Sequence, residues 1–180
     1  DVAFVDLWGC VHNGVTALPE AVAALQKYRA QGGKVVLVTN SPRPRMGVQK
    51  QLVHFGVPDD AWDTIATSGD SARAALFSGI VGAQIYFIGT PGEEKFFEPI
   101  GVIKDPIDVQ MVPMEQATGI VCTGPRDSMA DPSVMRSEFL MAKQMGLKLL
   151  CANPDIVVDR GHVREWCAGA LAQLYTEMGG

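Results

Sequence analysis

Two apolar runs within the first forty residues each end in polar residues, and this pattern constrains the fold more than any other feature. Val2–Val5 leads into Asp6, and Val35–Val38 leads into Thr39 and Asn40. Short, continuously apolar runs are typical of strands buried in a sheet. An aspartate after one such run can simply cap a turn. Polar groups at the ends of two successive runs instead predict a shared site.

A helix is predicted between the two runs. Its signals are Pro19 near the start, Glu20 in the first turn, Val22, Leu25 and Tyr28 on one stripe, and Gly32-Gly33 at the stop. Strand, helix and strand form a right-handed βαβ unit, whose strands can lie about 5 Å apart in a parallel sheet. Ligands of such sheets bind outside the carboxyl ends of the strands. The Asp6 carboxylate and the Thr39 hydroxyl are therefore expected to face one small volume.

The alternation of strands and helices continues along the chain. Helices are predicted at residues 45–55, from 68 through 76, and at 93–100, 132–145 and 163–178, and strands at 65–67, 85–88, 119–122 and 148–152. This order is typical of an α/β protein with parallel sheets. We expect a core of residues 1–67 and 153–180, with residues 68–152 inserted as a smaller α/β unit. The final helix is expected to pack against the core sheet, and residues 104–118 to form an irregular connection.

Composition excludes several classes of protein. A chain of 180 residues with 47% apolar residues can fill a hydrophobic interior. A formal net charge of −5, without clustered Lys and Arg, argues against a nucleic-acid or membrane-surface partner. No apolar run reaches the roughly 18 residues of a membrane helix, so a soluble, cytoplasmic protein is expected. The four cysteines lack zinc-site spacing and are predicted to be free thiols.

The strand ends and a later turn resemble a known family. The chain resembles the first two motifs of the haloacid dehalogenase superfamily of phosphohydrolases at Asp6-Leu7-Trp8-Gly9, at Asn13-Gly14 and from Val35 to Asn40. It is similar to the class IIA branch at Asn153-Pro154-Asp155, Ala168-Gly169-Ala170 and Gly179-Gly180. The resemblance implies a three-layer, Rossmann-like core with a parallel sheet and an inserted, smaller type-2 α/β cap.

The resemblance also implies a chemistry. The Asp6 carboxylate would attack phosphorus of a small phosphorylated molecule, and water would then hydrolyse the aspartyl-phosphate. Asp6 and the main-chain carbonyl of Trp8 would hold Mg²⁺, which prefers hard oxygen ligands. Thr39 and Asn40 would bind the transferring phosphoryl group. The remaining substrate- or phosphate-binding residues are expected to be Leu7, Trp8, Asn153 and Asp155. Thr39 and Asn40 could instead form only a turn, and Asn153 and Asp155 only an Asx turn around Pro154.

Two departures from the family pattern bear on activity. The second aspartate of the first motif, the acid and base of the family, is replaced by Trp8. The lysine of the third motif and the metal-binding acid of the fourth are expected after Gly180, and the chain opens at Asp1 without Met. The sequence is therefore interpreted as part of a longer protein, with weak phosphatase activity biased toward good leaving groups.

Two other functions remain open on the sequence. A phospho-ligand-binding protein without catalysis is favoured by Trp8. A dehalogenase-like hydrolase would need neither magnesium nor a second aspartate, but such enzymes typically carry a helical cap. Asn13-Gly14 predicts a tight turn in a flap, Cys10–Val15, beside Asp6, and His12 in this flap is interpreted as a packing or surface residue. The family resemblance is compatible with a homodimer.

Overall fold

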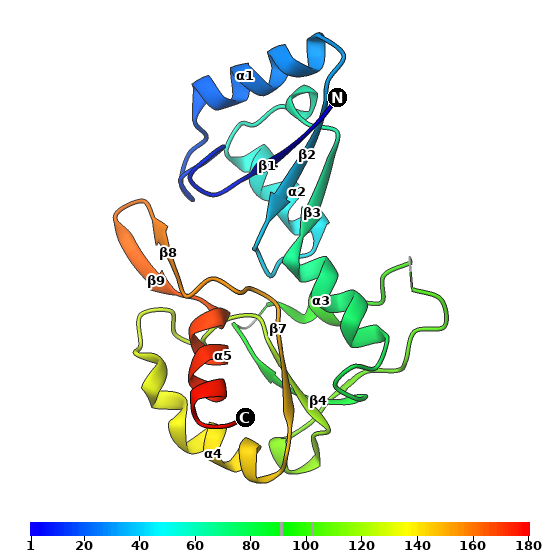
Figure 1. Ribbon diagram of the computed structural model, residues 1–180, viewed down its shortest axis with the longest axis vertical. Coiled ribbons are helices and arrows are strands. Elements are labelled where there is room, and N and C mark those ends of the chain that lie inside the picture. Colours follow the sequence, from blue (N-terminus) through cyan, green and yellow to red (C-terminus); the bar gives the residue numbers. More distant parts are fainter. Residues whose placement is uncertain (91, 102) are drawn as a thin grey trace.

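The computed structural model describes residues 1–90, 92–101 and 103–180, and Figure 1 shows two units, each built on its own sheet. The first sheet is parallel, in the order β1-β2-β3, with β1 at Val2–Asp6, β2 at Lys34–Thr39 and β3 at Thr64–Thr67. Helix α1 (Pro19–Ala30) joins β1 to β2, and α2 (Arg45–His54) with the 3₁₀ helix η1 (Asp59–Ala61) joins β2 to β3. The predicted βαβ unit is confirmed.

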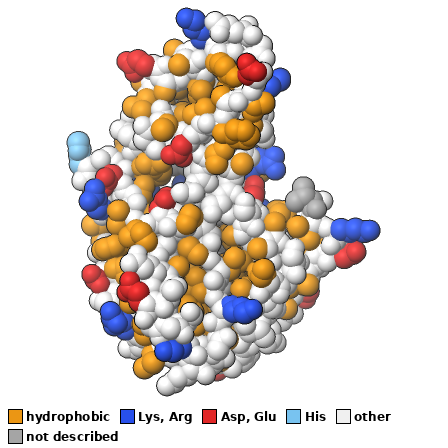
Figure 2. Space-filling view, viewed as in Figure 1, with side chains coloured by type: hydrophobic (Ala, Val, Ile, Leu, Met, Phe, Trp, Pro, Cys, Tyr) orange, Lys and Arg blue, Asp and Glu red, His pale blue; other side chains and the backbone are white. Residues whose placement is uncertain are grey.

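Helices α1 and α2 cover the same face of the first sheet. Leu37 of β2 packs into a core that also contains Leu25 of α1 and Leu52 of α2. Alternate strand residues point to the opposite face, where Phe4 and Val38 are 75% and 39% exposed. Figure 2 shows apolar side chains gathered on the visible face of this unit.

The second sheet is also parallel and has the order β5-β4-β6-β7. Its strands are β4 (Gln84–Ile88), β5 (Gln110–Met111), β6 (Gly119–Cys122) and β7 (Lys148–Cys151). The helices of this unit are α3 (Ser68–Phe77), α4 (Arg136–Gln144) and α5 (Ala168–Glu177), with the 3₁₀ helices η2 (Glu94–Phe97), η3 (Met114–Gln116) and η4 (Pro132–Met135). An antiparallel hairpin of β8 (Val157–Arg160) and β9 (Val163–Trp166) precedes α5. The α/β class with parallel sheets is confirmed.

Both faces of the second sheet are covered. Ile85 and Val121 pack with Leu76 of α3 on one side. Ile120 lies on the other side, in the cluster that contains Phe139 of α4 and residues of α5. Helix-sheet-helix layering of this kind follows from strands that are apolar on both faces.

The structure corrects the predicted final helix in two respects. Residues 163–166 form strand β9 rather than the first turn of the helix, because they pair with β8 around Gly161, whose φ is +61°. Helix α5 packs against α4, β6 and β7 of the second sheet instead of the first sheet. The ring of its residue Tyr175 packs against Phe139 at an interplanar angle of 50°, with 5.1 Å between the ring centroids. Only the placement of α5 is corrected here. The other expected limits, a core of residues 1–67 and 153–180 with residues 68–152 inserted, remain a prediction.

The irregular connection predicted at residues 104–118 contains β5 and η3, which its few periodic apolar positions did not indicate. The predicted helix at residues 132–145 begins with the 3₁₀ turn η4 before α4. Across the described part of the chain, none of the helices has both the length and the apolar character that crossing a membrane requires.

Asp63, just before β3, joins three parts of the first unit. Its carboxylate accepts hydrogen bonds from the main-chain nitrogen of Val35 at 2.8 Å, from Arg29 of α1 at 3.0 Å and from Lys34 at 3.2 Å. The Val35 hydrogen bond, followed by the bond from Arg29, lowers the pKa of Asp63 from 3.8 to about 2. The ionised carboxylate therefore stabilises the folded state.

We expect Asp63→Asn to change the acid dependence of stability. Because the folded-state pKa lies below the ordinary value, the contribution of Asp63 is complete above pH 3.8 and is lost as the pH falls toward about 2. Urea unfolding across this range should show a steeper loss of stability in the wild type than in the variant. Asp60→Asn is the matched control, since Asp60 is exposed and, among the described residues, its carboxylate accepts a hydrogen bond from Gln26 alone. Parallel curves for wild type and Asp63→Asn would contradict the assignment.

Candidate active site at the junction of the two units

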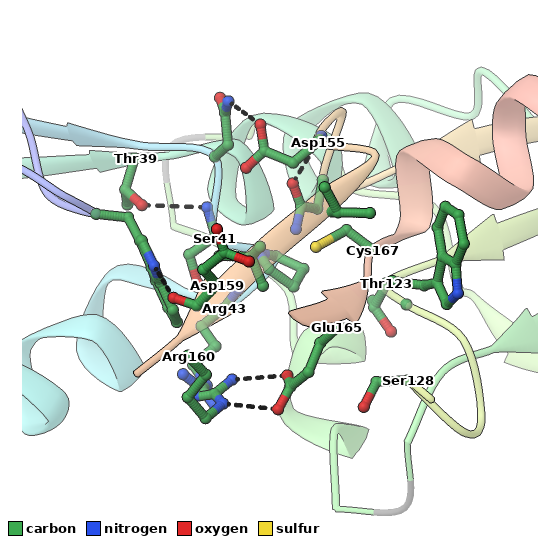
Figure 3. A pocket seen from close by; sticks show the side chains of 18 of the residues that line it. Thr39, Ser41, Arg43, Thr123, Ser128, Asp155, Asp159, Arg160, Glu165 and Cys167 are labelled. Carbon is green, nitrogen blue, oxygen red and sulfur yellow. Dashed lines mark hydrogen bonds and ion pairs between the residues drawn. The ribbon is translucent and has the colours of Figure 1, made fainter. Parts of the chain in front are cut away.

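A cavity of about 710 Å³ lies at the carboxyl ends of the first sheet. Its wall is formed by the ends of β1 and β2, by the residues after β6 and β7, and by both strands of the β8–β9 hairpin. The close-up in Figure 3 shows side chains from these separate segments around one space. A volume of this size is typical of pockets for small molecules.

The register of the first sheet brings the two predicted strand ends together. Asp6 lies beside Val38 in the ladder, so the next residue of β2, Thr39, follows directly at the same edge. Asp6 and Thr39 both line the cavity, and the side chain of Asp6 is exposed whereas Thr39 is buried. The spatial prediction drawn from the two apolar runs agrees with this geometry.

Hydrogen bonds fix both groups. Asp6 Oδ1 accepts from the main-chain nitrogen of Leu7 at 2.8 Å, and no hydrogen bond among the described residues occupies Oδ2. Thr39 Oγ1 accepts from the main-chain nitrogen of Ser41 at 3.2 Å (Figure 3). Since a hydroxyl can donate as well as accept, the Thr39 proton stays available to a ligand oxygen. The pair thus presents one carboxylate oxygen and one hydroxyl donor.

The loop after β7 reaches the same place. Asn40 Nδ2 donates to Asp155 Oδ1 at 2.8 Å, and the main-chain nitrogen of Asp155 donates to Asn153 Oδ1 at 3.0 Å. The Asx turn considered for this segment is therefore formed, and Asp155 additionally contacts the end of β2. Asn40, Asn153 and Asp155 all line the cavity.

Leu7 and Trp8 have different positions. The side chain of Leu7 is 1% exposed and packs in the core of the first unit, so the structure does not bring it to the cavity. Trp8 does line the cavity, but its indole nitrogen donates to the main-chain oxygen of Asp159 in the hairpin at 2.9 Å. Arg160 lies over the indole ring, 5.2 Å from its centroid.

His12 is a packing residue of the flap. It is 2% exposed, and its Nδ1 accepts from the main-chain nitrogen of Gly14 at 3.1 Å. Burial lowers the pKa of His12 below 6.5, and Arg160 lowers it further, against an opposing effect of Asp6. The imidazole is therefore held in its neutral form, which agrees with its interpretation from the sequence.

Several residues of the cavity wall were not predicted from the sequence. Thr123, after β6, donates to Glu93 Oε2 at 2.5 Å. Arg160 and Glu165 of the hairpin form two hydrogen bonds at 3.0 and 3.3 Å (Figure 3). Thr123 stands at the carboxyl end of a parallel strand, as Asp6 does, so the same rule could have found it. The two short strand-like runs around Gly161 are the signal for the hairpin.

Gly69, in the first turn of α3, supports the loop after β2. Its main-chain nitrogen donates to the oxygen of Ser41 at 3.0 Å. A Cβ at this position would lie 2.1 Å from the main-chain oxygen of Pro42, closer than any normal contact. The loop that carries Ser41, Pro42 and Arg43 along the cavity therefore needs a glycine beneath it.

Comparisons with known proteins agree on one family. The sequence profile described as haloacid dehalogenase-like hydrolase matches residues 3–103. A structure of a haloacid dehalogenase-like hydrolase from Brucella suis 1330 is 42% identical, with a TM-score of 0.91, and the match covers 100% of this chain and 64% of that one. The chain thus spans slightly less than two thirds of that relative. Comparison with curated proteins gave no match.

Two more distant structures share the fold. One is a p-nitrophenyl phosphatase from Archaeoglobus fulgidus, with 22% identity, coverage of 98% of this chain and 65% of that one, and a TM-score of 0.66. The other is a glycerol phosphate phosphatase from Mycobacterium tuberculosis in complex with magnesium, with 22% identity, coverage of 100% and 52%, and a TM-score of 0.68. At these identities the likeness concerns the fold alone.

We expect Gly69→Ala to destabilise the protein by about 1–3 kcal/mol, the usual effect of forcing extra atoms into a packed site. Gly47→Ala in α2 is the matched control, because the added Cβ would meet Arg43 at an ordinary 3.4 Å. The control should be neutral or more stable by about 0.5–1 kcal/mol, since alanine favours a helix over glycine. Urea unfolding measures both variants. Equal effects would show that Pro42 does not restrict position 69.

Proposed function

The chain belongs to the family of haloacid dehalogenase-like hydrolases, and from this premise we propose that the protein is a magnesium-dependent phosphatase of small phosphorylated metabolites. The observation that carries the proposal is the exposed carboxylate of Asp6, which lines the same cavity as Thr39 at the carboxyl edge of the first sheet. A nucleophile at this edge has access to a ligand, whereas the rest of β1 is committed to the sheet.

The proposed reaction has two steps. The free oxygen of Asp6 attacks phosphorus, the bond to the ester oxygen breaks, and an aspartyl-phosphate forms. Water then cleaves this intermediate and regenerates the carboxylate, so that one difficult step is replaced by two easier ones. The hydrogen bond from Leu7 to Oδ1 orients the carboxylate, and the Thr39 hydroxyl donates to the phosphoryl oxygens.

The donors beside Asp6 suit a magnesium ion. Mg²⁺ is usually held by one or two carboxylates, together with waters and substrate phosphate. Asp6 supplies a carboxylate oxygen, and the main-chain carbonyl of Trp8 accepts no hydrogen bond from the described residues. The bound ion would neutralise charge on the phosphoryl oxygens. This role of position 8 uses the main chain and does not depend on the indole.

Position 8 offers no carboxylic acid that could donate a proton to the leaving group, because its residue is Trp8. The indole of Trp8 cannot supply it, and the neutral, buried His12 is not suited to do so. Proton transfer by a positioned group contributes about 10²–10⁴-fold to a rate. We therefore propose slow turnover that favours aryl and acyl phosphates, whose leaving groups need little protonation. The cavity volume of about 710 Å³ favours a small metabolite over a macromolecule.

Binding of a phosphorylated ligand without catalysis is the second candidate. The commitment of the Trp8 indole to the hairpin favours it, because no proton donor replaces the lost carboxylate. A dehalogenase-like reaction at carbon is less well supported, since the second unit has a four-stranded sheet rather than a helical cap. A homodimer stays a prediction.

We expect Asp6→Asn to abolish magnesium-dependent release of phosphate, because an amide is a poor nucleophile. The measurement is phosphate release by the full-length protein from a panel of small phosphate esters, with magnesium and with a chelator. Asp108→Asn, an exposed site outside the cavity lining, should retain the wild-type rate. Ligand binding without release in the wild type would favour the second candidate.

A comparison of leaving groups tests the missing acid. The wild type should hydrolyse aryl phosphates faster than alkyl phosphates. Trp8→Asp should raise kcat for alkyl phosphates by up to about 10²-fold, which is the smallest contribution usually found for a positioned general acid. Equal wild-type rates on both classes, or an unchanged kcat in Trp8→Asp with the protein still folded, would contradict the role assigned to position 8.

A further inference from the structure

The side chain of Trp8 contacts the β8–β9 hairpin, and the role proposed for the main chain of residue 8 does not account for these contacts. The indole nitrogen of Trp8 donates to the main-chain oxygen of Asp159 at 2.9 Å, across a separation of 151 residues. An indole nitrogen is only a donor, and a carbonyl is only an acceptor. An ionised carboxylate at position 8 could not make this contact, because it has no proton to donate.

The ring of Trp8 makes a second contact with the same hairpin. The guanidinium of Arg160 lies 5.2 Å from the ring centroid, a distance at which a cation is attracted to the aromatic face. Two hydrogen bonds from Arg160 to Glu165, on the opposite strand of the hairpin, hold the guanidinium there. Both strands of the hairpin are thereby tied to one side chain.

The flap beside Asp6 is shaped to hold the indole. Gly14 has a φ of +83°, and a Cβ on it would lie 2.3 Å from Cζ2 of Trp8. On another side the ring meets His12 edge-on, with 5.3 Å between centroids. His12 in turn packs on Phe55, at 5.0 Å, near the end of α2. The indole therefore packs closely against residues of the first unit.

A third contact fixes the tip of the hairpin to the flap. The main-chain nitrogen of Gly161 donates to the oxygen of Asn13 at 3.2 Å. Because this bond joins main-chain atoms, it depends on the two segments being held at the right distance. Trp8 contacts both segments, since its ring meets His12 of the flap and its indole nitrogen donates to Asp159 of the hairpin.

We propose that Trp8 is a positioning residue that fixes the β8–β9 hairpin as a wall of the cavity, and that this role has replaced proton transfer at position 8. Residues of both strands line the cavity, among them Val158, Arg160 and Glu165. Their placement determines the shape available to the leaving group of the substrate. Trp8 thus affects the binding of substrate indirectly, by holding the hairpin in place. The kinetic part of this inference rests on the proposed phosphatase function.

Trp8→Phe in the full-length protein tests the inference, because phenylalanine keeps an aromatic ring and removes the N–H donor. Trp62→Phe is the matched control: within the described residues the buried indole nitrogen of Trp62 has no hydrogen-bond partner, so its removal breaks no bond. Hydrogen–deuterium exchange should increase across residues 157–166 in Trp8→Phe and stay at the wild-type level in Trp62→Phe. Unchanged exchange of the hairpin in Trp8→Phe would overturn the proposal.

Steady-state kinetics distinguish this positioning role from a general loss of stability, because positioning should change KM more than kcat. In Trp8→Phe we expect KM for an aryl phosphate to rise about 3- to 10-fold, the factor that corresponds to one ordinary hydrogen bond. The value of kcat should change less than KM, since Asp6 and Thr39 do not contact the indole nitrogen. A fall in kcat with unchanged KM would contradict the proposal. Trp8→Asp should also raise KM, even where its kcat increases.

Arg160→Gln is the second variant, and it leaves the Trp8 hydrogen bond in place. It should loosen the hairpin in the same exchange experiment, with a smaller change than Trp8→Phe, because only the cation–aromatic contact and the Glu165 ion pair are lost. No loosening in either variant would overturn the proposal. If the wild type releases no phosphate under any condition, the proposed function fails, and the exchange data alone decide the role of Trp8.

Discussion

The parallel pairing of β1 with β2 is the constraint on which the site depends. Its register places Asp6 beside Val38, so that the carboxylate and the Thr39 hydroxyl leave the sheet at one edge. A shift of either strand by one residue would turn that strand's terminal side chain to the opposite face of the sheet, because side chains alternate along a strand. The buried Leu37 fixes this register, since it belongs to the core beneath α1 and α2.

The second unit completes the site through contacts that span the chain. The bond from Asn40 to Asp155 ties the end of β2 to the loop after β7. A glycine at the start of a helix supports each of these two loops. A Cβ on Gly69 would collide with the main-chain oxygen of Pro42, and one on Gly169 would lie 2.2 Å from that of Pro154. Close approach of helix and loop therefore requires glycine at both positions.

The side chain of Trp8 makes contacts that a carboxylate at position 8 could not make. In the proposed mechanism a carboxylate there would transfer protons, whereas the indole donates to a carbonyl of the hairpin and carries a cation on its face. Neither contact is available to a carboxylate in the same place. The main chain of residue 8 keeps its position next to Asp6 in either case, so a metal contact through its carbonyl is compatible with both side chains.

The sequence by itself determined the βαβ unit and the two polar strand ends, because both depend on apolar runs and turn residues that are close along the chain. For His12 it left a surface and a packing position open, and the structure shows the buried one. The sequence did not determine that residues 163–166 pair with β8, nor where α5 packs, since an apolar stripe of Leu171 and Leu174 fits any apolar surface. Only the tertiary structure shows that the side chain of Leu7 is buried away from the cavity and that Trp8 donates a hydrogen bond to Asp159. Such contacts depend on the placement of whole elements, which no local pattern of residues specifies.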